Sequence, residues 1–322
     1  MNDDEMVREL LQGAGPRRPL PADDLVSIRE AARIEWRHRY GRAASPWSFR
    51  PWIAVAAAGL LAVAGLVWWA RARQAASGSA VASIERAAGV GKWRTGDSLR
   101  GGSEIETRSE LDGAGRLALR MAGGASVRLD SDTSVRLASA REVELDRGAV
   151  YVDTGAGPGR GEEVAVRTPA GLFVGLGTQF EVRAEESAGT RLRVREGNVR
   201  LDRGGSPVLT GAGRELVVRG DGTLSEGAIA ISGPQWDWVL ATAPTIEIEG
   251  VKVVRFLDWI ARETGWRVEY ADEEATSLAD SVELHGSIAG LTPVDATGVV
   301  LSSAGLGYRV SDGTLVVFVA KK

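Results

Sequence analysis

An uncharged apolar stretch of nineteen residues, Trp52–Ala70, constrains the fold of this 322-residue chain more than any other feature of its sequence. At about 1.5 Å per residue, a helix of this length reaches about 28 Å, close to the hydrocarbon thickness of a bilayer. A buried core helix would carry polar residues on one side, and a cleaved signal sequence would be shorter and begin near the first residue. The sequence therefore predicts one transmembrane helix over residues 51–71.

Arginine and tryptophan flank this predicted helix on both sides, as they do at membrane–water interfaces. Six arginines lie between residues 29 and 50, whereas three, Arg71, Arg73 and Arg86, lie in the twenty positions after the stretch. Because the more basic flank stays in the cytoplasm, we expect a cytoplasmic N-terminus and a C-terminus across the membrane. The predicted interface residues are Trp47, Arg50, Trp52, Trp68, Trp69 and Arg71.

Residues 1–50 predict a short cytoplasmic segment with a helix at residues 23–40. Arg29, Arg33 and Arg37 recur every four residues and would share one helix face, while Trp36 lies on the apolar side. Such an arginine face is typical of a topology signal beside anionic lipid, and it also suits docking to a protein partner. Arg29, Arg33, Trp36 and Arg37 are therefore the candidate partner face.

After a linker at residues 72–88, short alternations of apolar and polar residues, separated by glycine, predict an all-β domain at residues 89–225. Two neighbouring runs, Glu142–Leu145 and Ala149–Val152, are predicted as separate strands. The spacing suits either a β-sandwich or a β-solenoid, and both remain open. The predicted inward-facing residues are Leu117, Leu119, Val127, Leu129, Val135, Leu137, Val143, Leu145, Val150 and Val152.

Residues 244–322 change pattern again and predict a small α+β domain in the order βαβ, βαβ, β, so that the whole chain is mainly β. One helix is expected at residues 251–264, and a second begins at Thr292-Pro293. Glycines end both helices, and an Asp-Gly pair predicts the turn of a terminal hairpin. These residues are Gly265, Gly305 and Asp312-Gly313, and the other expected strands are residues 245–249, 266–270 and 282–288.

The composition excludes several classes of chemistry. The chain has no cysteine, which rules out disulfides, thiolate zinc sites and a cysteine nucleophile. Of its two histidines, His285 is expected to be exposed on a strand without a second imidazole nearby. A formal charge of −4 provides no overall positive field for nucleic acid. We therefore expect no enzymatic activity, no cofactor, no metal site and no nucleic-acid partner.

Seven ordered segments of the predicted β domain combine glycine turns with alternating apolar residues. They are residues 94–99, 102–107, 124–130, 144–148, 166–171, 177–182 and 194–199. These segments resemble the FecR family of transmembrane regulators from Gram-negative bacteria. The resemblance implies an inner-membrane protein of anti-sigma type, whose periplasmic part senses an outer-membrane signal and whose cytoplasmic segment controls an extracytoplasmic-function sigma factor.

The C-terminal segment carries Phe256–Ala261 with Thr264-Gly265, the strand Val268–Tyr270, the run Leu284–Ser287, and Leu306–Val310. These residues are similar to the short N-terminal signalling domain of secretins and TonB-dependent receptors, known as STN. The resemblance implies a periplasmic partner, either the signalling domain of a TonB-dependent receptor or another STN-like domain. We expect that partner to dock on an edge strand or a helix face.

Some FecR proteins cleave themselves at a Gly-Thr bond, and Gly177-Thr178 corresponds to that motif. A threonine hydroxyl can attack the preceding carbonyl where the backbone is held strained. A glycine bulge followed by a strand threonine explains the same pair without cleavage.

Two functions therefore remain after the sequence is considered. The first is an inner-membrane signal transducer that regulates a sigma factor. The alternative is an envelope-anchored periplasmic module that binds a polysaccharide or assembly partner without sigma-factor control.

Overall fold

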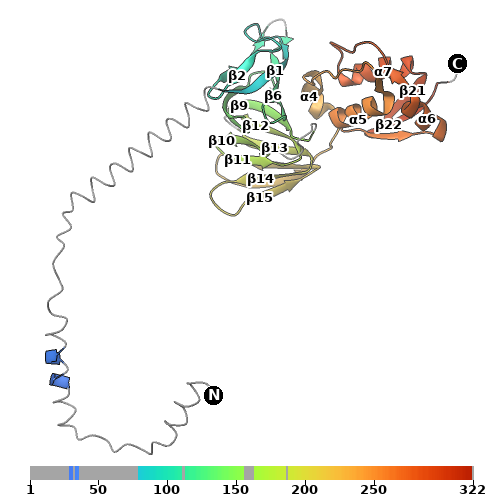
Figure 1. Ribbon diagram of the computed structural model, residues 1–322. Helices are drawn as coiled ribbons and strands as arrows, with labels where there is room; N and C mark the ends of the chain where they lie inside the picture. The colour runs from blue at the N-terminus through green and yellow to red at the C-terminus, as the bar shows by residue number, and fades with distance from the viewer. Residues whose placement is uncertain are drawn as a thin grey trace, which may run out of the picture. The chain divides into compact units, whose positions relative to one another are not determined.

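The computed structural model describes residues 29–31, 33–35, 79–110, 113–155, 163–185 and 188–320. The chain divides into two compact units, Met1–Val67 and Trp68–Lys322. In the first unit, residues 29–31 and 33–35 are helical and exposed. In the second unit, strands and helices follow one another from Ala80 to Val319 (Figure 1).

Among the described residues, no helix is both long and apolar enough to cross a membrane. The predicted transmembrane helix at residues 51–71 lies outside the described residues. The same holds for its predicted interface residues, Trp47, Arg50, Trp52, Trp68, Trp69 and Arg71.

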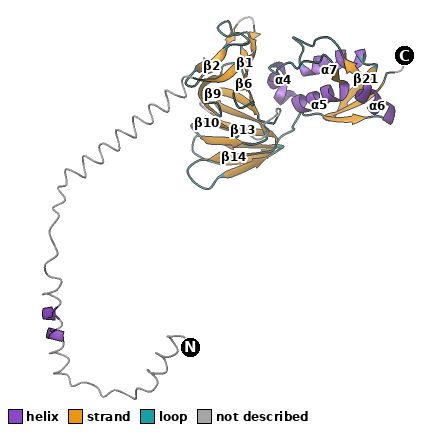
Figure 2. Ribbon diagram, viewed as in Figure 1, coloured by secondary structure: helices purple, strands orange, loops and turns teal. Residues whose placement is uncertain are grey.

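Strands β1 to β17 form the β domain (Figure 2). Residues 80–88, which the sequence analysis placed in the linker, are its first strand, and their small apolar residues pair with β6 and enter the core. Fifteen of these strands join one mixed sheet, and the short strands β4 and β5 pair with each other. Their bounds are β1 Ala80–Ala88, β2 Ser98–Arg100, β3 Glu104–Glu106, β4 Ser109–Glu110, β5 Gly113–Ala114, β6 Arg116–Met121, β7 Ser126–Leu129, β8 Ser134–Ser139, β9 Glu142–Asp153, β10 Val164–Thr168, β11 Gly171–Gly175, β12 Gln179–Glu185, β13 Gly189–Glu196, β14 Asn198–Asp202, β15 Val208–Gly211, β16 Arg214–Val218 and β17 Leu224–Ala228.

The sheet has two halves that share strand β9. One half contains β2, β1, β6, β7, β9, β12, β13, β16 and β17, and the other contains β3, β8, β9, β10, β11, β14 and β15. Apart from the parallel pair β9–β10, the described strands of this domain pair antiparallel. A β-solenoid would stack its coils in parallel, so this pairing is that of an antiparallel layered fold.

Side chains from both halves form one hydrophobic core, which includes Leu117, Val143, Phe173 and Phe180. All ten residues predicted to face inward are buried, with at most 1% of each exposed. The prediction of a mainly β chain is therefore confirmed.

Strand β9 belongs to both halves because it bends at Gly148. Its residues before the bend pair with β8, and those after it pair with β7 and β12. Gly148 has φ of 87°, and a Cβ there would lie 2.5 Å from the Cα of Thr133, so only glycine fits this bend. The two strands predicted at residues 142–145 and 149–152 are thus one strand with a bend between its core-facing segments.

A short connection follows β17 and covers part of the first half. It contains the 3₁₀-helix η1, Pro234–Trp236, and the helix α4, Asp237–Ala241. Trp236 is fully buried and packs edge-on against Tyr151, with ring centroids 6.1 Å apart. Because Tyr151 alternates along β9 with core residues Val150 and Val152, it points away from the core, and Trp236 covers it there.

The C-terminal module, residues 244–320, contains three helices and two small sheets. In its larger sheet β22 lies between β19 and β21, parallel to the first and antiparallel to the second. Helices α5 and α7 contribute Phe256, Leu257 and Leu301 to a separate core. The elements are β18 Val251–Lys252, α5 Val253–Thr264, β19 Arg267–Tyr270, α6 Glu273–Ser281, β20 Glu283–Leu284, α7 Pro293–Ser303, β21 Leu306–Ser311 and β22 Thr314–Val319.

The sequence predicted the ends of α5 and α7 and the final turn correctly. Gly265 and Gly305 are both left-handed, with φ of 72° and 73°, and Asp312-Gly313 connects β21 to β22. Thr292 caps α7 by accepting a hydrogen bond from the backbone N–H of Asp295.

Two local predictions in this module were wrong, and one helix was missed. Residues 245–249 form no strand, because no described strand pairs with them, and the strand predicted at 282–288 is only Glu283–Leu284. Helix α6 was not predicted, because its buried face consists of the small residues Ala275 and Ala279 rather than large apolar side chains. The observed order is therefore βαβαβαββ.

Candidate functional site

The end of helix α5 contacts the β domain through charged side chains rather than apolar ones. Arg128 of β7 is 1% exposed and forms a two-point ion pair with Glu263, which lies 135 residues later. Its Nη2 lies 2.9 Å from Oε1 of Glu263, and its Nη1 lies 2.7 Å from Oε2. Nη1 also donates to the carbonyl of Val239 at 3.0 Å.

Both members of this pair are buried, and Glu263 supplies the counter-ion of Arg128. Burial lowers the pKa of Arg128, but the charge and hydrogen bond of Glu263 outweigh that effect and raise the pKa overall. The guanidinium also lies 5.3 Å from the ring centroid of Tyr151. Burial raises the pKa of Tyr151 to about 12, so its phenol is neutral at physiological pH.

A second ion pair joins Asp153, at the end of β9, to Arg262 of α5. Nε of Arg262 lies 3.0 Å from Oδ2 of Asp153, and Nη1 lies 3.1 Å from Oε2 of Glu196. Burial raises the pKa of Asp153, but the hydrogen bond and charge of Arg262 lower it further than burial raises it. Gln179 donates through Nε2 to both Asp153 and the carbonyl of Arg262, at 3.0 and 3.1 Å.

Arg195 of β13 caps the C-terminal end of α5. It donates from Nη1 to the carbonyl of Glu263 at 2.7 Å and from Nη2 to the carbonyl of Thr264 at 3.3 Å. The last carbonyls of a helix lack partners within the helix and carry a partial negative charge. A buried guanidinium satisfies both requirements here. We name Arg128, Asp153, Arg195, Arg262 and Glu263 the ionic cluster.

The Gly177-Thr178 pair lies in the turn between β11 and β12, next to this cluster. Gly177 is left-handed, with φ of 63°, and Thr178 is fully buried. The backbone N–H of Thr178 donates to Oγ1 of Thr154 at 2.7 Å, and the N–H of Thr154 donates to the carbonyl of Thr178 at 3.0 Å. Within the described residues, Oγ1 of Thr178 has no hydrogen-bond partner, and self-cleavage at this bond stays a prediction.

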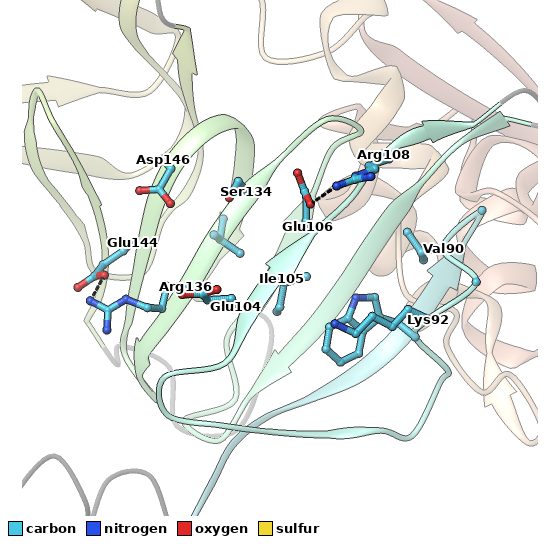
Figure 3. A pocket seen from close by; sticks show the side chains of 14 residues that line it. Val90, Lys92, Glu104, Ile105, Glu106, Arg108, Ser134, Arg136, Glu144 and Asp146 are labelled. Carbon is cyan, nitrogen blue, oxygen red and sulfur yellow. Dashed lines mark hydrogen bonds and ion pairs between the residues drawn. The ribbon is translucent and has the colours of Figure 1, made fainter.

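A polar groove of about 600 Å³ lies on the other half of the β domain, beside edge strand β3 (Figure 3). Glu106 accepts a hydrogen bond from Arg108 at 2.8 Å, and Arg136 pairs with Glu144. Nζ of Lys92 lies 4.9 Å from the ring centroid of Trp93. The sequence analysis did not identify this groove, because its side chains come from two loop segments and three strands that alternation alone does not bring together.

The C-terminal module exposes several apolar side chains on α7 and β21. Strand β21 pairs only with β22 in the described sheet, so its other edge is open. The exposed side chains are Val294 and Val299 on α7 and Tyr308 and Val310 on β21, of which Val299 is the most exposed, at 57%.

The remaining predicted site residues are separate from these features. Arg29 and Arg33 are helical and exposed, whereas Trp36 and Arg37 lie outside the described residues. His285 is exposed, and its Nδ1 lies 2.9 Å from Oε1 of Glu249, a contact that the sequence did not indicate. No group of three or more histidine and acidic residues suited to a metal ion occurs among the described residues.

Comparison with known families identifies part of the β domain. The family model FecR, described as FecR protein, matches residues 103–200, from just before β3 to within β14. The predicted FecR domain is therefore confirmed over these residues. The STN-like nature of the C-terminal module stays a prediction.

Similar solved structures include two crystal structures, at 1.65 and 2.50 Å resolution, of a protein from Parabacteroides distasonis ATCC 8503 that is provisionally assigned as an anti-sigma factor. They have 17% sequence identity and TM-scores of 0.37 and 0.36, cover 68% of this chain, and are themselves covered over 100% and 99% of their length. No curated protein matches the sequence significantly.

Proposed function

We propose that this chain, which carries a FecR domain at residues 103–200, is a single-pass inner-membrane regulator of anti-sigma type for an extracytoplasmic-function sigma factor. The FecR match is the observation that carries the proposal. The family resemblance connects such a domain to signalling across the inner membrane, from a periplasmic or outer-membrane signal to transcription.

The proposed topology places the N-terminus in the cytoplasm and residues 72–322 in the periplasm. It is supported by the apolar stretch Trp52–Ala70 and by the excess of arginine before it. A compartment reporter fused after Lys322 tests this arrangement. Activity of a periplasm-dependent reporter is expected, and activity of a cytosol-dependent reporter would contradict the topology.

The proposed sigma-factor contact lies on the N-terminal helix. Arg29 and Arg33 are exposed and stand four residues apart, so their side chains lie on the same side of a helix. Together with Trp36 and Arg37, they would present a basic face with one aromatic residue to a groove on the partner.

The proposed periplasmic contact uses the open edge of β21 and the exposed apolar side chains on that strand. An open edge offers unpaired backbone groups to another strand, and Tyr308 and Val310 add side chains that a partner could bury. The partner is the signalling domain of a TonB-dependent receptor or another STN-like domain.

Deletion of residues 1–45, with a short basic sequence left in their place, tests the regulatory function. Target transcription is expected to change while membrane insertion is retained. Transcription that stays unchanged would contradict sigma-factor control. A pull-down through the cytoplasmic end, compared with a variant in which Arg29 and Arg33 are both replaced by Gln, tests whether this face holds the sigma factor.

The groove beside β3 favours a second candidate function, that of an envelope-anchored binding module. It combines Trp93 with carboxylates such as Glu104 and Asp146, a combination of aromatic and polar groups that suits a polysaccharide. Binding of cell-wall oligosaccharides by the full chain, measured by calorimetry and abolished in Trp93→Ala, would support it. Absence of binding together with altered transcription on deletion of residues 1–45 would leave the regulator as the function.

A further inference from the structure

We propose that the ionic cluster is a latch that holds the C-terminal module on the β domain, and that its opening loosens the Gly177-Thr178 turn. The latch consists of Arg128, Asp153 and Arg195 on the β domain and Arg262 and Glu263 on α5. It is a property of the periplasmic fold and does not depend on sigma-factor binding.

The composition of this contact distinguishes it from the two hydrophobic cores. The β domain and the C-terminal module each have a core of their own, and the residues of α5 in the second core do not reach the first. Helix α5 instead meets the β domain through three ion pairs, Arg128–Glu263, Arg262–Asp153 and Arg262–Glu196, and through the Arg195 cap. Beside these polar contacts, the connecting segment covers Tyr151 through a small apolar cluster that includes Trp236 and Val239. A contact made mostly of charge pairs and hydrogen bonds can separate while exposing only this small cluster, whereas separating a core would expose a large apolar surface.

The contact is also closely fitted at its centre. A Cβ on Gly265 would lie 2.4 Å from the carbonyl oxygen of Ile231, in the connection that precedes the module. A Cβ on Gly155 would lie 2.5 Å from Nη2 of Arg262. The end of α5 and the backbone at residue 231 are therefore in close contact when the latch is closed.

The latch is connected to the Gly177-Thr178 turn by a short chain of contacts. Gln179, directly after Thr178, donates to Asp153 and to the carbonyl of Arg262. Thr154, directly after Asp153, exchanges hydrogen bonds with the backbone of Thr178. When α5 leaves, Gln179 loses one acceptor and Asp153 loses its counter-ion, so the two strand ends that hold the turn lose support.

The energetics predict a strong asymmetry between single and double substitutions. Removing one member of a buried ion pair leaves the other charge buried and unpaired, which is strongly destabilising, whereas removing both leaves no orphan charge. Glu263→Gln should therefore favour release, because it removes the counter-ion of a guanidinium that is 1% exposed. Arg128→Met combined with Glu263→Met should restore much of the docking that either substitution alone disrupts.

Hydrogen–deuterium exchange on the full chain in detergent micelles tests the latch. In Glu263→Gln, peptides covering residues 229–243, 260–266 and 176–180 are expected to exchange about tenfold faster or more. Peptides from strand β6 and from the β21–β22 hairpin should keep their rates. The matched control is Asp258→Asn, which removes an exposed ion pair with Arg255 on the same helix. If Glu263→Gln does not accumulate, Arg262→Gln at the more exposed end of the cluster replaces it, with the same three peptides expected to respond.

Each alternative result overturns a defined part of the proposal. Faster exchange throughout the β domain and the module would identify Glu263 as a contributor to global stability rather than to a latch. Unchanged exchange at residues 229–243 and 260–266 would contradict the latch itself. Faster exchange at the end of α5 with unchanged exchange at residues 176–180 would contradict the connection to the turn.

Discussion

The guanidinium of Arg195 lies 4.5 Å from the ring centroid of Trp236 and, from the same position, donates to the last carbonyls of helix α5. Its Nε also donates to the carbonyl of Ile231 at 2.7 Å. One side chain of the FecR-type β domain thus fixes both the connecting segment and the first helix of the C-terminal module. Such a three-way contact requires the planar, multi-donor geometry of arginine.

Replacing Arg195 should therefore weaken the fold more than a surface arginine would. For Arg195→Gln we expect the free energy of unfolding to fall by about 2 to 4 kcal/mol, because hydrogen bonds from a charged donor contribute about 1.5 to 3 kcal/mol each and are not additive. Arg195→Lys keeps the charge but not the several N–H donors of the planar guanidinium, so an intermediate loss of unfolding free energy is expected. Urea unfolding of the full chain measures both, and Arg255→Gln on the exposed face of α5 is the control. Equal effects of Arg195→Gln and Arg255→Gln would contradict this role.

Alanine substitutions at the two glycines that end helices α5 and α7 distinguish the cost of backbone strain from the cost of a steric clash with residue 231. Gly265 and Gly305 share a left-handed conformation, but a Cβ on Gly265 meets Ile231, whereas a Cβ on Gly305 meets nothing within 4 Å. Both alanine variants should lose about 1 to 2 kcal/mol from strain. Gly265→Ala should lose about 1 to 3 kcal/mol more, because its methyl group forces the module away from residue 231. If both variants lose the same free energy of unfolding, measured by heat or urea, the close contact between Gly265 and the carbonyl of Ile231 is contradicted.

The sequence predicted the parts of the fold that depend on local pattern. Period-two alternation identified ten core residues of the β domain, and all ten are buried. Glycine and Asp-Gly signals located the ends of α5 and α7 and the final turn. These signals succeed because strand alternation and positive φ are properties of a few consecutive residues.

Two identical tetrapeptides explain why the ionic cluster was not predicted. Ser126–Leu129 and Ser134–Leu137 both read Ser-Val-Arg-Leu, and in both the valine and leucine enter the core. The side chain of Arg136 is 38% exposed, whereas that of Arg128 is 1% exposed because residues 236–263 cover its strand face. Local pattern determines which side of a strand a residue occupies, but a partner 135 residues away determines whether that side meets solvent.

The contact between His285 and Glu249 predicts a shifted histidine titration. Hydrogen bonding to Glu249, reinforced by its charge, raises the pKa of His285 above its ordinary value of 6.5. The backbone N–H of Gly286, followed by His285, lowers the pKa of Glu249 below its ordinary value of 4.5. The contribution of His285 to the stability of the folded state is complete below its unfolded pKa and is lost as pH rises through the raised folded pKa. The contribution of Glu249 is present above its unfolded pKa and is lost as pH falls through the lowered folded value.

The contact between His285 and Glu249 is therefore strongest in mildly acidic solution, where the histidine is protonated and the carboxyl group is ionised. NMR titration of the His285 ring in the full chain should give a pKa above 6.5, and Glu249→Gln should bring it back toward 6.5. Asp295→Asn, remote from this contact, should leave the His285 pKa unchanged. A His285 pKa at or below 6.5 in the unmodified chain would contradict the contact.

One sequence prediction remains to be tested, namely self-cleavage of the Gly177-Thr178 bond. The attacking group would be the buried hydroxyl of Thr178. In the proposed step, Oγ1 of Thr178 attacks the carbonyl carbon of Gly177, the C–N bond breaks, and the hydroxyl proton passes to the released amine. Water then hydrolyses the resulting ester, leaving a carboxylate on Gly177 and a free hydroxyl on Thr178. Gly177 has a left-handed φ of 63°, and the backbone N–H of Thr178 is held by Oγ1 of Thr154.

Fragments ending at residue 177 and beginning at residue 178 are therefore expected when the full chain is purified. Thr178→Ser should still give both fragments, Thr178→Val should give none, and Thr210→Val, which alters another buried hydroxyl without a partner among the described residues, should behave like the unmodified chain. Mass spectrometry with N-terminal sequencing identifies the products. A fragment that begins at residue 178 in the Thr178→Val variant would assign the cut to a separate protease, and an intact chain throughout would mean that the Gly177 turn serves only to start strand β12.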